Sequence, residues 1–135
     1  MLNRFAQIFE EFLTEKSLHF NTRIDSDGDS VVEFPYKGKE AKMFFTGENG
    51  EYLSMFIVFA RVPAERVSDL IFTCNEMNAK YKWVKFYLDK DADVVASIDA
   101  YIDDYTCGEE CMKLVRRVVN ITDEAYPTFA RAMWA

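Results

Sequence analysis

The sequence predicts an α+β domain in which an antiparallel sheet packs against helices. Segments with helical periodicity alternate along the chain with runs whose hydrophobicity has a period of two. Short turns rich in Gly and Asp join the period-two runs, as in β-hairpins. The expected order is a helix, three or four strands, a helix, two strands and a helix. A chain of 135 residues can bury one core, so residues 1–135 are expected to form a single domain.

Composition and charge narrow the classes of function. Half of the residues are hydrophobic and the formal net charge is -7. An acidic protein repels a phosphate backbone, so we expect no nucleic-acid partner. No window approaches the 18 or so apolar residues of a membrane span, and the three cysteines are too few and odd in number for a disulfide framework. We therefore expect a cytoplasmic protein with reduced thiols.

The first half of the chain reads as one helix followed by two hairpins. Residues 2–16 carry an aromatic stripe at helical spacing, which predicts a helix packed on the sheet. Pro35 lacks an N–H donor, so its strand should be an edge strand or stop early. Both faces of Leu53–Phe59 are apolar, which predicts a central strand covered on both sides. The expected strands are Phe20–Ile24, Val31–Tyr36, Ala41–Thr46 and Tyr52–Val62.

The second helix is expected over residues 63–79, because Pro63 suits the first turn of a helix. Its predicted buried face consists of Val67, Leu70, Ile71, Cys74, Met77 and Asn78.

The two strands after this helix alternate strictly. In the first, Val84, Phe86 and Leu88 form one side, and in the second the aliphatic side runs from Val94 to Ile102. The opposite side is unusually aromatic for a surface in water. It forms the candidate interaction face, which another subunit, the chain's own long helix or a partner would cover: Trp83, Tyr87, Val95 and Tyr101.

The last helix begins with the capping-box pattern Thr106-Cys107-Gly108-Glu109 and carries an apolar stripe over residues 112–133. Pro127 lies inside the stripe, so the helix is expected to kink or break near residues 123–126.

No pattern indicates catalysis, a cofactor or a metal. His19 is the only histidine, and Cys107 and Cys111 lack the further ligands of a zinc site. The acidic residues 25–29 do not follow the spacing of a calcium loop, so a turn explains them better. The acids near the second hairpin also read as solvated turn residues. We therefore expect no catalytic, cofactor-binding or metal-binding residues and no enzyme activity.

The order of elements and a few local signatures resemble the YbjN family, within the type III secretion chaperone-like superfamily. The signatures are Asn75-Glu76-Met77-Asn78 at the end of the second helix, the strand pair from Trp83 to Ile102, and Asp123-Glu124-Ala125-Tyr126-Pro127 in the last helix. The resemblance implies a small homodimeric domain that binds proteins and has a regulatory role in bacteria. Two alternatives stay open: a dedicated secretion chaperone for an effector segment, and a small-ligand-binding protein or enzyme with a pocket between sheet and helices.

Overall fold

The computed structural model of the protein describes residues 1–134 and has the expected α+β order, with four strands in the first group. The elements are α1 (Arg4–Glu15), β1 (Asn21–Ile24), β2 (Ser30–Tyr36), β3 (Lys39–Thr46), β4 (Tyr52–Arg61), the short 3-10 helix η1 (Ala64–Arg66), α2 (Val67–Lys80), β5 (Lys85–Leu88), β6 (Asp93–Tyr101) and α3 (Cys107–Trp134).

The six strands form one antiparallel sheet in the order β1-β2-β3-β4-β6-β5. β6 pairs with β4 along most of its length, while β5 forms one edge of the sheet and β1 the other. β1 pairs only with residues 30–33 of β2, so β2 is locally an edge where Pro35 lies. The missing N–H of this proline therefore disrupts no pairing with β1, although β2 as a whole is an inner strand that continues to Tyr36 and not the edge strand that the sequence predicted.

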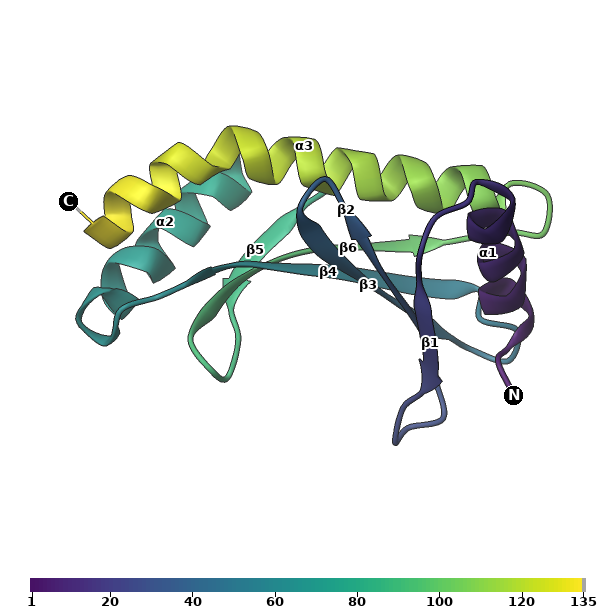
Figure 1. The fold of residues 1–135 in the computed structure, drawn as a ribbon. Helices are drawn as coiled ribbons and strands as arrows, with labels where there is room; N and C mark the ends of the chain where they lie inside the picture. The colour runs from purple at the N-terminus through teal and green to yellow at the C-terminus, as the bar shows by residue number, and fades with distance from the viewer. Residues whose placement is uncertain (135) are drawn as a thin grey trace.

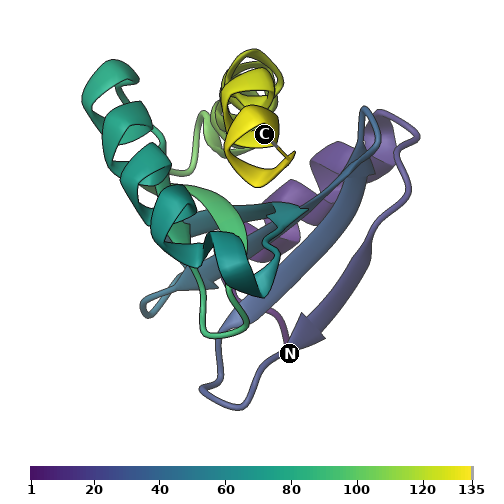
Figure 2. The ribbon, with the colours of Figure 1, turned by 90° about the vertical axis from the view of Figure 1, so that its left-hand side faces the viewer.

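All three helices pack on the same side of the sheet. α3 runs along the sheet, and α1 and α2 lie near its opposite ends (Figures 1 and 2). In α1, the ring of Phe9 contacts Phe34 at 5.8 Å and Phe45 at 6.0 Å between centroids. In α3, Phe129 contacts Phe86 at 5.1 Å. The core therefore lies between one side of the sheet and the helices, and no described helix covers the other side.

This arrangement corrects two predictions. β4 is central, but it is covered on one side only: Met55 is fully buried, whereas Val58 is 49% exposed. In α2, Leu70 and Met77 are buried as predicted, but Ile71 is 57% exposed. The helix packs mainly on β5 at the edge of the sheet and on α3, so its buried stripe is narrower than the apolar pattern.

α1 and α3 approach closely at Gly108. A Cβ atom at this position would overlap the side chain of Phe12, so the glycine makes the close contact possible. Further along, α3 continues through Pro127 to Trp134 without a break. Ala125 and Phe129, on either side of the proline, are both buried in the core, and this packing holds the helix together across it.

The predicted capping box does not form. The backbone N–H and the hydroxyl of Thr106 both donate to the carboxylate of Asp103, at 3.2 and 3.0 Å. The N–H that Glu109 would have bound is therefore already taken by a residue of the preceding loop.

The second asparagine of the Asn-Glu-Met-Asn run clamps α2 to the edge strand. Asn78 Nδ2 donates to the Phe86 carbonyl at 3.0 Å, and Asn78 Oδ1 accepts from the Phe86 N–H at 2.7 Å. The side-chain amide thus imitates a neighbouring strand at the outer edge of β5. Such a cover protects an edge strand against pairing with other chains.

Replacing Asn78 with Asp should destabilise the fold, because a carboxylate cannot donate to the Phe86 carbonyl and adds repulsion toward it. We expect Asn78→Asp to lower the free energy of unfolding by about 1–3 kcal/mol. Urea denaturation measures this. The matched control is Asn75→Asp, which adds the same charge to an exposed position one turn earlier. An equal effect of both changes would contradict the clamp.

Candidate interaction surface

The side of the sheet that faces away from the helices, here called the open face, is defined by strand register. Residues paired across the strands point to the same side. One row across the sheet contains Arg23, Val31, Phe44, Ser54 and Asp99. The neighbouring rows contain Glu33, Lys42, Phe56, Ser97 and Lys85; Thr46, Tyr52 and Tyr101; and Val58, Val95 and Tyr87.

Aromatic rings lie on the open face from its middle to the end where β4 begins and β6 ends. Phe44 and Phe56 on neighbouring strands lie 5.1 Å apart, and Tyr52 and Tyr101 lie 5.3 Å apart between centroids. Tyr52 is 55% exposed and Tyr101 is 72% exposed. Adjacent exposed aromatic side chains of this kind are enriched in protein–protein interfaces.

Polar contacts hold this aromatic surface in place. The Arg23 guanidinium lies 5.8 Å from the centroid of the Phe44 ring and forms an ion pair of 2.9 Å with Glu33. On the other side, the Ser54 hydroxyl donates to Asp99 at 2.8 Å. Positive and negative side chains therefore lie beside the rings. This arrangement resembles the polar rim and apolar centre of protein interfaces.

The structure places three of the four predicted face residues on the open face, with Tyr101 six residues along β6 from the Tyr87–Val95 pair. Tyr87, Val95 and Tyr101 all lie on the open face, although Val95 is 3% exposed and contributes only support. Burial raises the pKa of Tyr87, and Asp89 and Asp99 raise it further. The open face is not covered by α3, which lies on the other side (Figure 1).

Trp83 lies apart from the other three. It precedes β5 in a bend with φ of 78°, a conformation that bulky residues rarely adopt. Its ring stacks on the Arg117 guanidinium of α3 at 4.6 Å, on the side of the helices. Strict alternation placed this residue on the open face, but alternation does not hold across a positive-φ bend.

Sequence reasoning missed Phe44, Phe56 and Tyr52 as parts of this surface. Their signal was present, because they alternate with the buried Met43, Phe45, Leu53 and Met55. Apolar residues on both sides of a strand predict burial on both sides, whereas in β4 one side stays partly exposed.

A second exposed apolar patch lies on the outer side of α2. Ile71 is 57% exposed and the adjacent Phe72 is 63% exposed. The helix has its buried side toward Leu70, Thr73, Cys74 and Met77, so this pair faces away from the core.

The three cysteines and the histidine are side chains that could act as nucleophiles or bases. Cys107 and Cys111 are buried, and their thiols form a hydrogen bond that lowers the pKa of Cys107 and raises that of Cys111. Burial raises the pKa of Cys74 to about 11, so this thiol stays protonated at neutral pH. His19 is exposed.

The carboxylates of Asp25, Asp27 and Asp29 come within 4.8 Å of one another. Asp25 Oδ1 accepts the N–H groups of both Asp27 and Asp29 at 3.0 Å, which closes the β1–β2 hairpin. Burial raises the pKa of Asp29, and repulsion from Asp25 and Asp27 adds to it. The cluster is thus accounted for by the turn that the sequence predicts.

A pocket of about 540 Å³ lies between the end of β4 and the end of α3. It is lined by Phe59, Tyr126, Trp134 and other apolar groups, with Arg61 as the charged residue. One charged side chain in an open depression is unlike the convergent polar groups of a small-ligand site.

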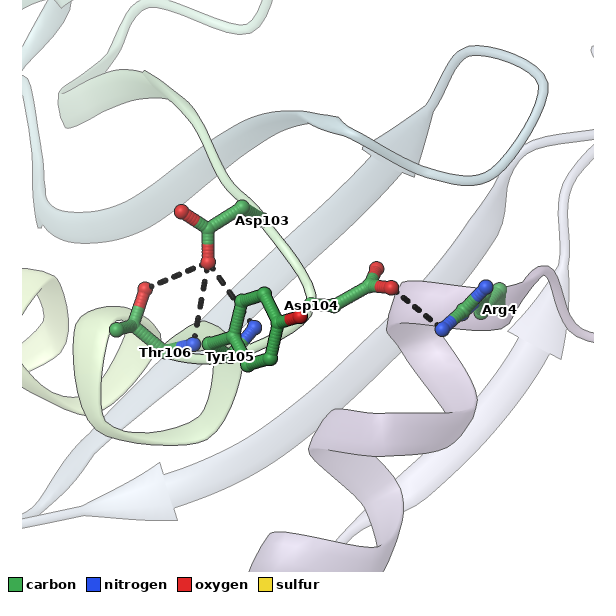
Figure 3. A network of polar contacts seen from close by, with 5 residues as sticks. All are labelled: Arg4, Asp103, Asp104, Tyr105 and Thr106. Carbon is green, nitrogen blue, oxygen red and sulfur yellow. Dashed lines mark hydrogen bonds and ion pairs between the residues drawn. The ribbon is translucent and has the colours of Figure 1, made fainter.

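The loop between β6 and α3 follows directly after the exposed Tyr101. Asp103 Oδ1 accepts from the N–H of Tyr105 and from Thr106, and Asp104 forms an ion pair with Arg4 of α1 at 2.5 Å (Figure 3). The hydrogen bonds from Thr106 lower the pKa of Asp103. The loop is therefore fixed, and it presents Tyr105 almost fully exposed, at 98%.

None of the described helices combines the length and the hydrophobicity that crossing a membrane would require.

Comparison with known proteins gives one family. The profile of the family described as "YbjN: Putative bacterial sensory transduction regulator" matches residues 6–131. No curated protein sequence matches the chain significantly.

Two solved structures share the fold. One is described as the Yersinia pestis type III secretion chaperone SycH in complex with a stable fragment of YscM2; the match has a TM-score of 0.56 and 18% identity, and covers 91% of this chain and 98% of that chain. The other is the heterodimeric ExoU–SpcU complex from the type III secretion system of Pseudomonas aeruginosa, with a TM-score of 0.57, 17% identity, and coverage of 92% and 96%. The chain therefore has the type III secretion chaperone-like fold that its sequence predicts.

Proposed function

The chain belongs to the YbjN family, and we propose that it is a non-enzymatic regulatory protein of the bacterial cytoplasm that acts by binding other proteins as a homodimer. The observation that carries this proposal is the open face, where an aromatic surface is left uncovered by the chain's own helices. The two structures with the same fold are described as complexes with protein partners, which supports the same kind of activity here.

In this proposal two exposed surfaces have different binding roles. The Ile71–Phe72 patch of α2 is small and lies on one helix, so a second copy can pack against it in an antiparallel helix pair, as in many twofold dimers. The open face is wider and mixes rings with both signs of charge. We assign the open face to the protein partner and the α2 patch to the dimer.

A dedicated secretion chaperone is the second candidate, because the fold is shared with such chaperones. The two candidates differ in the partner. A chaperone would hold a segment of a protein that is later exported, whereas a regulator would bind a protein that stays in the cell. The identity of a protein captured on the open face distinguishes them.

We expect the purified protein to be a dimer and the α2 patch to hold it together. Light scattering at micromolar concentration should give twice the monomer mass for the unchanged chain. Phe72→Ser should weaken the dimer by about tenfold or more, the effect of losing one central aromatic contact. Trp83→Ser removes a similarly exposed aromatic ring elsewhere and should leave the mass unchanged. A monomer at high micromolar concentration, or equal effects of both changes, would remove the dimer assignment.

The open face should contact a different protein in the cell. A photo-crosslinking residue, p-benzoylphenylalanine, in place of Tyr101 should give an adduct with a second protein after illumination of living bacteria. The same residue in place of Asp91, at the exposed tip of the β5–β6 hairpin, is the control. An adduct between two copies of this chain would move the dimer to the open face. Equal labelling at both positions, or none, would refute the partner assignment.

A further inference from the structure

A groove of about 400 Å³ separates α1 from the start of α3, away from the open face and the α2 patch. We call it the α1–α3 groove. Its apolar lining comes from Ile8 and Phe12 of α1, both half-buried, and from Tyr105 in the loop before α3. It forms because Gly108 has no side chain and lets the two helices meet against Phe12.

Local contacts hold the backbone that carries the apolar part of the groove. The Phe12 ring stacks on the buried Phe9 ring, with centroids 6.2 Å apart and an angle of 13° between planes. Tyr105 stands in the loop that Asp103 holds by three hydrogen bonds, and Figure 3 shows its ring extending from this loop. The backbone at Tyr105 is therefore already ordered, which lowers the entropic cost of binding a segment against its ring.

Acidic side chains surround this apolar lining. Glu11, Glu15, Asp104 and Glu109 line the groove, against one cation, Lys16. Glu11, Glu15 and Glu109 form no ion pair among the described residues, whereas Asp104 is paired with Arg4.

Lys16 already makes a cation–π contact inside the groove. Lys16 Nζ lies 5.5 Å from the centroid of the Phe12 ring, within the range of a cation–π contact. The groove thus already holds one cation over an aromatic ring, with carboxylates in the same lining.

We propose that the α1–α3 groove binds a segment of a partner protein in which apolar residues are flanked by Lys or Arg. The apolar side chains would pack on Ile8, Phe12 and Tyr105, and the cations would face the carboxylates. Complementary charge of this kind steers encounter and selects partners, and it excludes acidic segments. The inference rests on the proposed protein-binding function and names the chemistry of the partner at a second surface.

The test measures binding of a fluorescein-labelled peptide of alternating Lys and Leu residues by fluorescence anisotropy. The full chain should bind it with an affinity that falls as NaCl is added, because salt screens exposed charges. Two control peptides carry Glu in place of Lys, or Ser in place of Leu. Both should bind at least tenfold more weakly. The Glu peptide loses the ion pairs with the groove, and the Ser peptide loses the apolar contacts.

Charge-matched variants locate the binding. The groove variant combines Glu11→Gln, Glu15→Gln and Glu109→Gln. The remote variant combines Asp27→Asn, Glu65→Gln and Asp91→Asn, which changes the net charge equally at exposed positions outside the groove. The groove variant should bind about tenfold more weakly, since three exposed ion pairs with the peptide are lost together. The remote variant should bind as the unchanged chain does.

Tyr105→Ser provides an apolar test that does not depend on charge. The residue is 98% exposed, so its replacement should leave the urea midpoint of unfolding unchanged. The affinity for the peptide should fall about tenfold.

The inference is overturned if the unchanged chain does not bind the Lys-Leu peptide, if the Lys-Ser peptide binds equally well, or if the remote variant loses as much affinity as the groove variant. Tyr101→Ser separates the two proposals. If this change abolishes peptide binding and the groove variant does not, the segment lies on the open face, and only the groove assignment fails. Crosslinking at position 101 tests the proposed function independently of whether the peptide binds.

Discussion

The packing of all three helices on one side of a single antiparallel sheet is the constraint on which the other features depend. Side chains of a strand alternate between its two sides, so a sheet with helices on one side must leave the other side to water or to another protein. In this chain the buried side carries Phe34, Phe45 and Met55, and the uncovered side carries Phe44, Phe56 and Tyr101. The rings on the uncovered side contact one another across the strands but pack against no helix of the protomer. Their presence is the physical reason for assigning a contact surface.

Short polar side chains fix the helices to this sheet. Asn3 Oδ1 accepts from the N–H of Ala6 at the start of α1, and Asn3 Nδ2 donates to the Phe45 carbonyl at 2.8 Å. Asn78 makes the corresponding connection between α2 and β5, and Asp103 holds the loop before α3. The Asn-Glu-Met-Asn run therefore has a structural meaning in this chain. Its last asparagine covers a sheet edge, which leaves the faces rather than that edge for association.

Much of the fold follows from sequence periodicity, and the exceptions have identifiable causes. The aromatic stripe of α1 and the alternation from Val94 to Ile102 gave the correct elements, because both patterns reflect burial against one core. The side of the sheet on which α3 packs depends on long-range contacts such as Phe129 with Phe86, which no local pattern contains. For this reason the sequence alone left open whether the chain's own helix covers the aromatic face. Trp83 was misplaced by a positive-φ bend, and the cap at Thr106 by a competing carboxylate from Asp103.

Hydroxyl-radical footprinting with mass spectrometry tests the central claim most directly, because it reads side-chain exposure in the intact purified protein. If the open face is uncovered, Tyr52 and Tyr101 should be oxidised at rates comparable with the fully exposed Tyr105, while Phe45 on the opposite side of the same sheet stays protected. Protection of Tyr52 and Tyr101 to the level of Phe45 in the purified protein would contradict the account, because the face would then be covered by the chain itself or by its second copy.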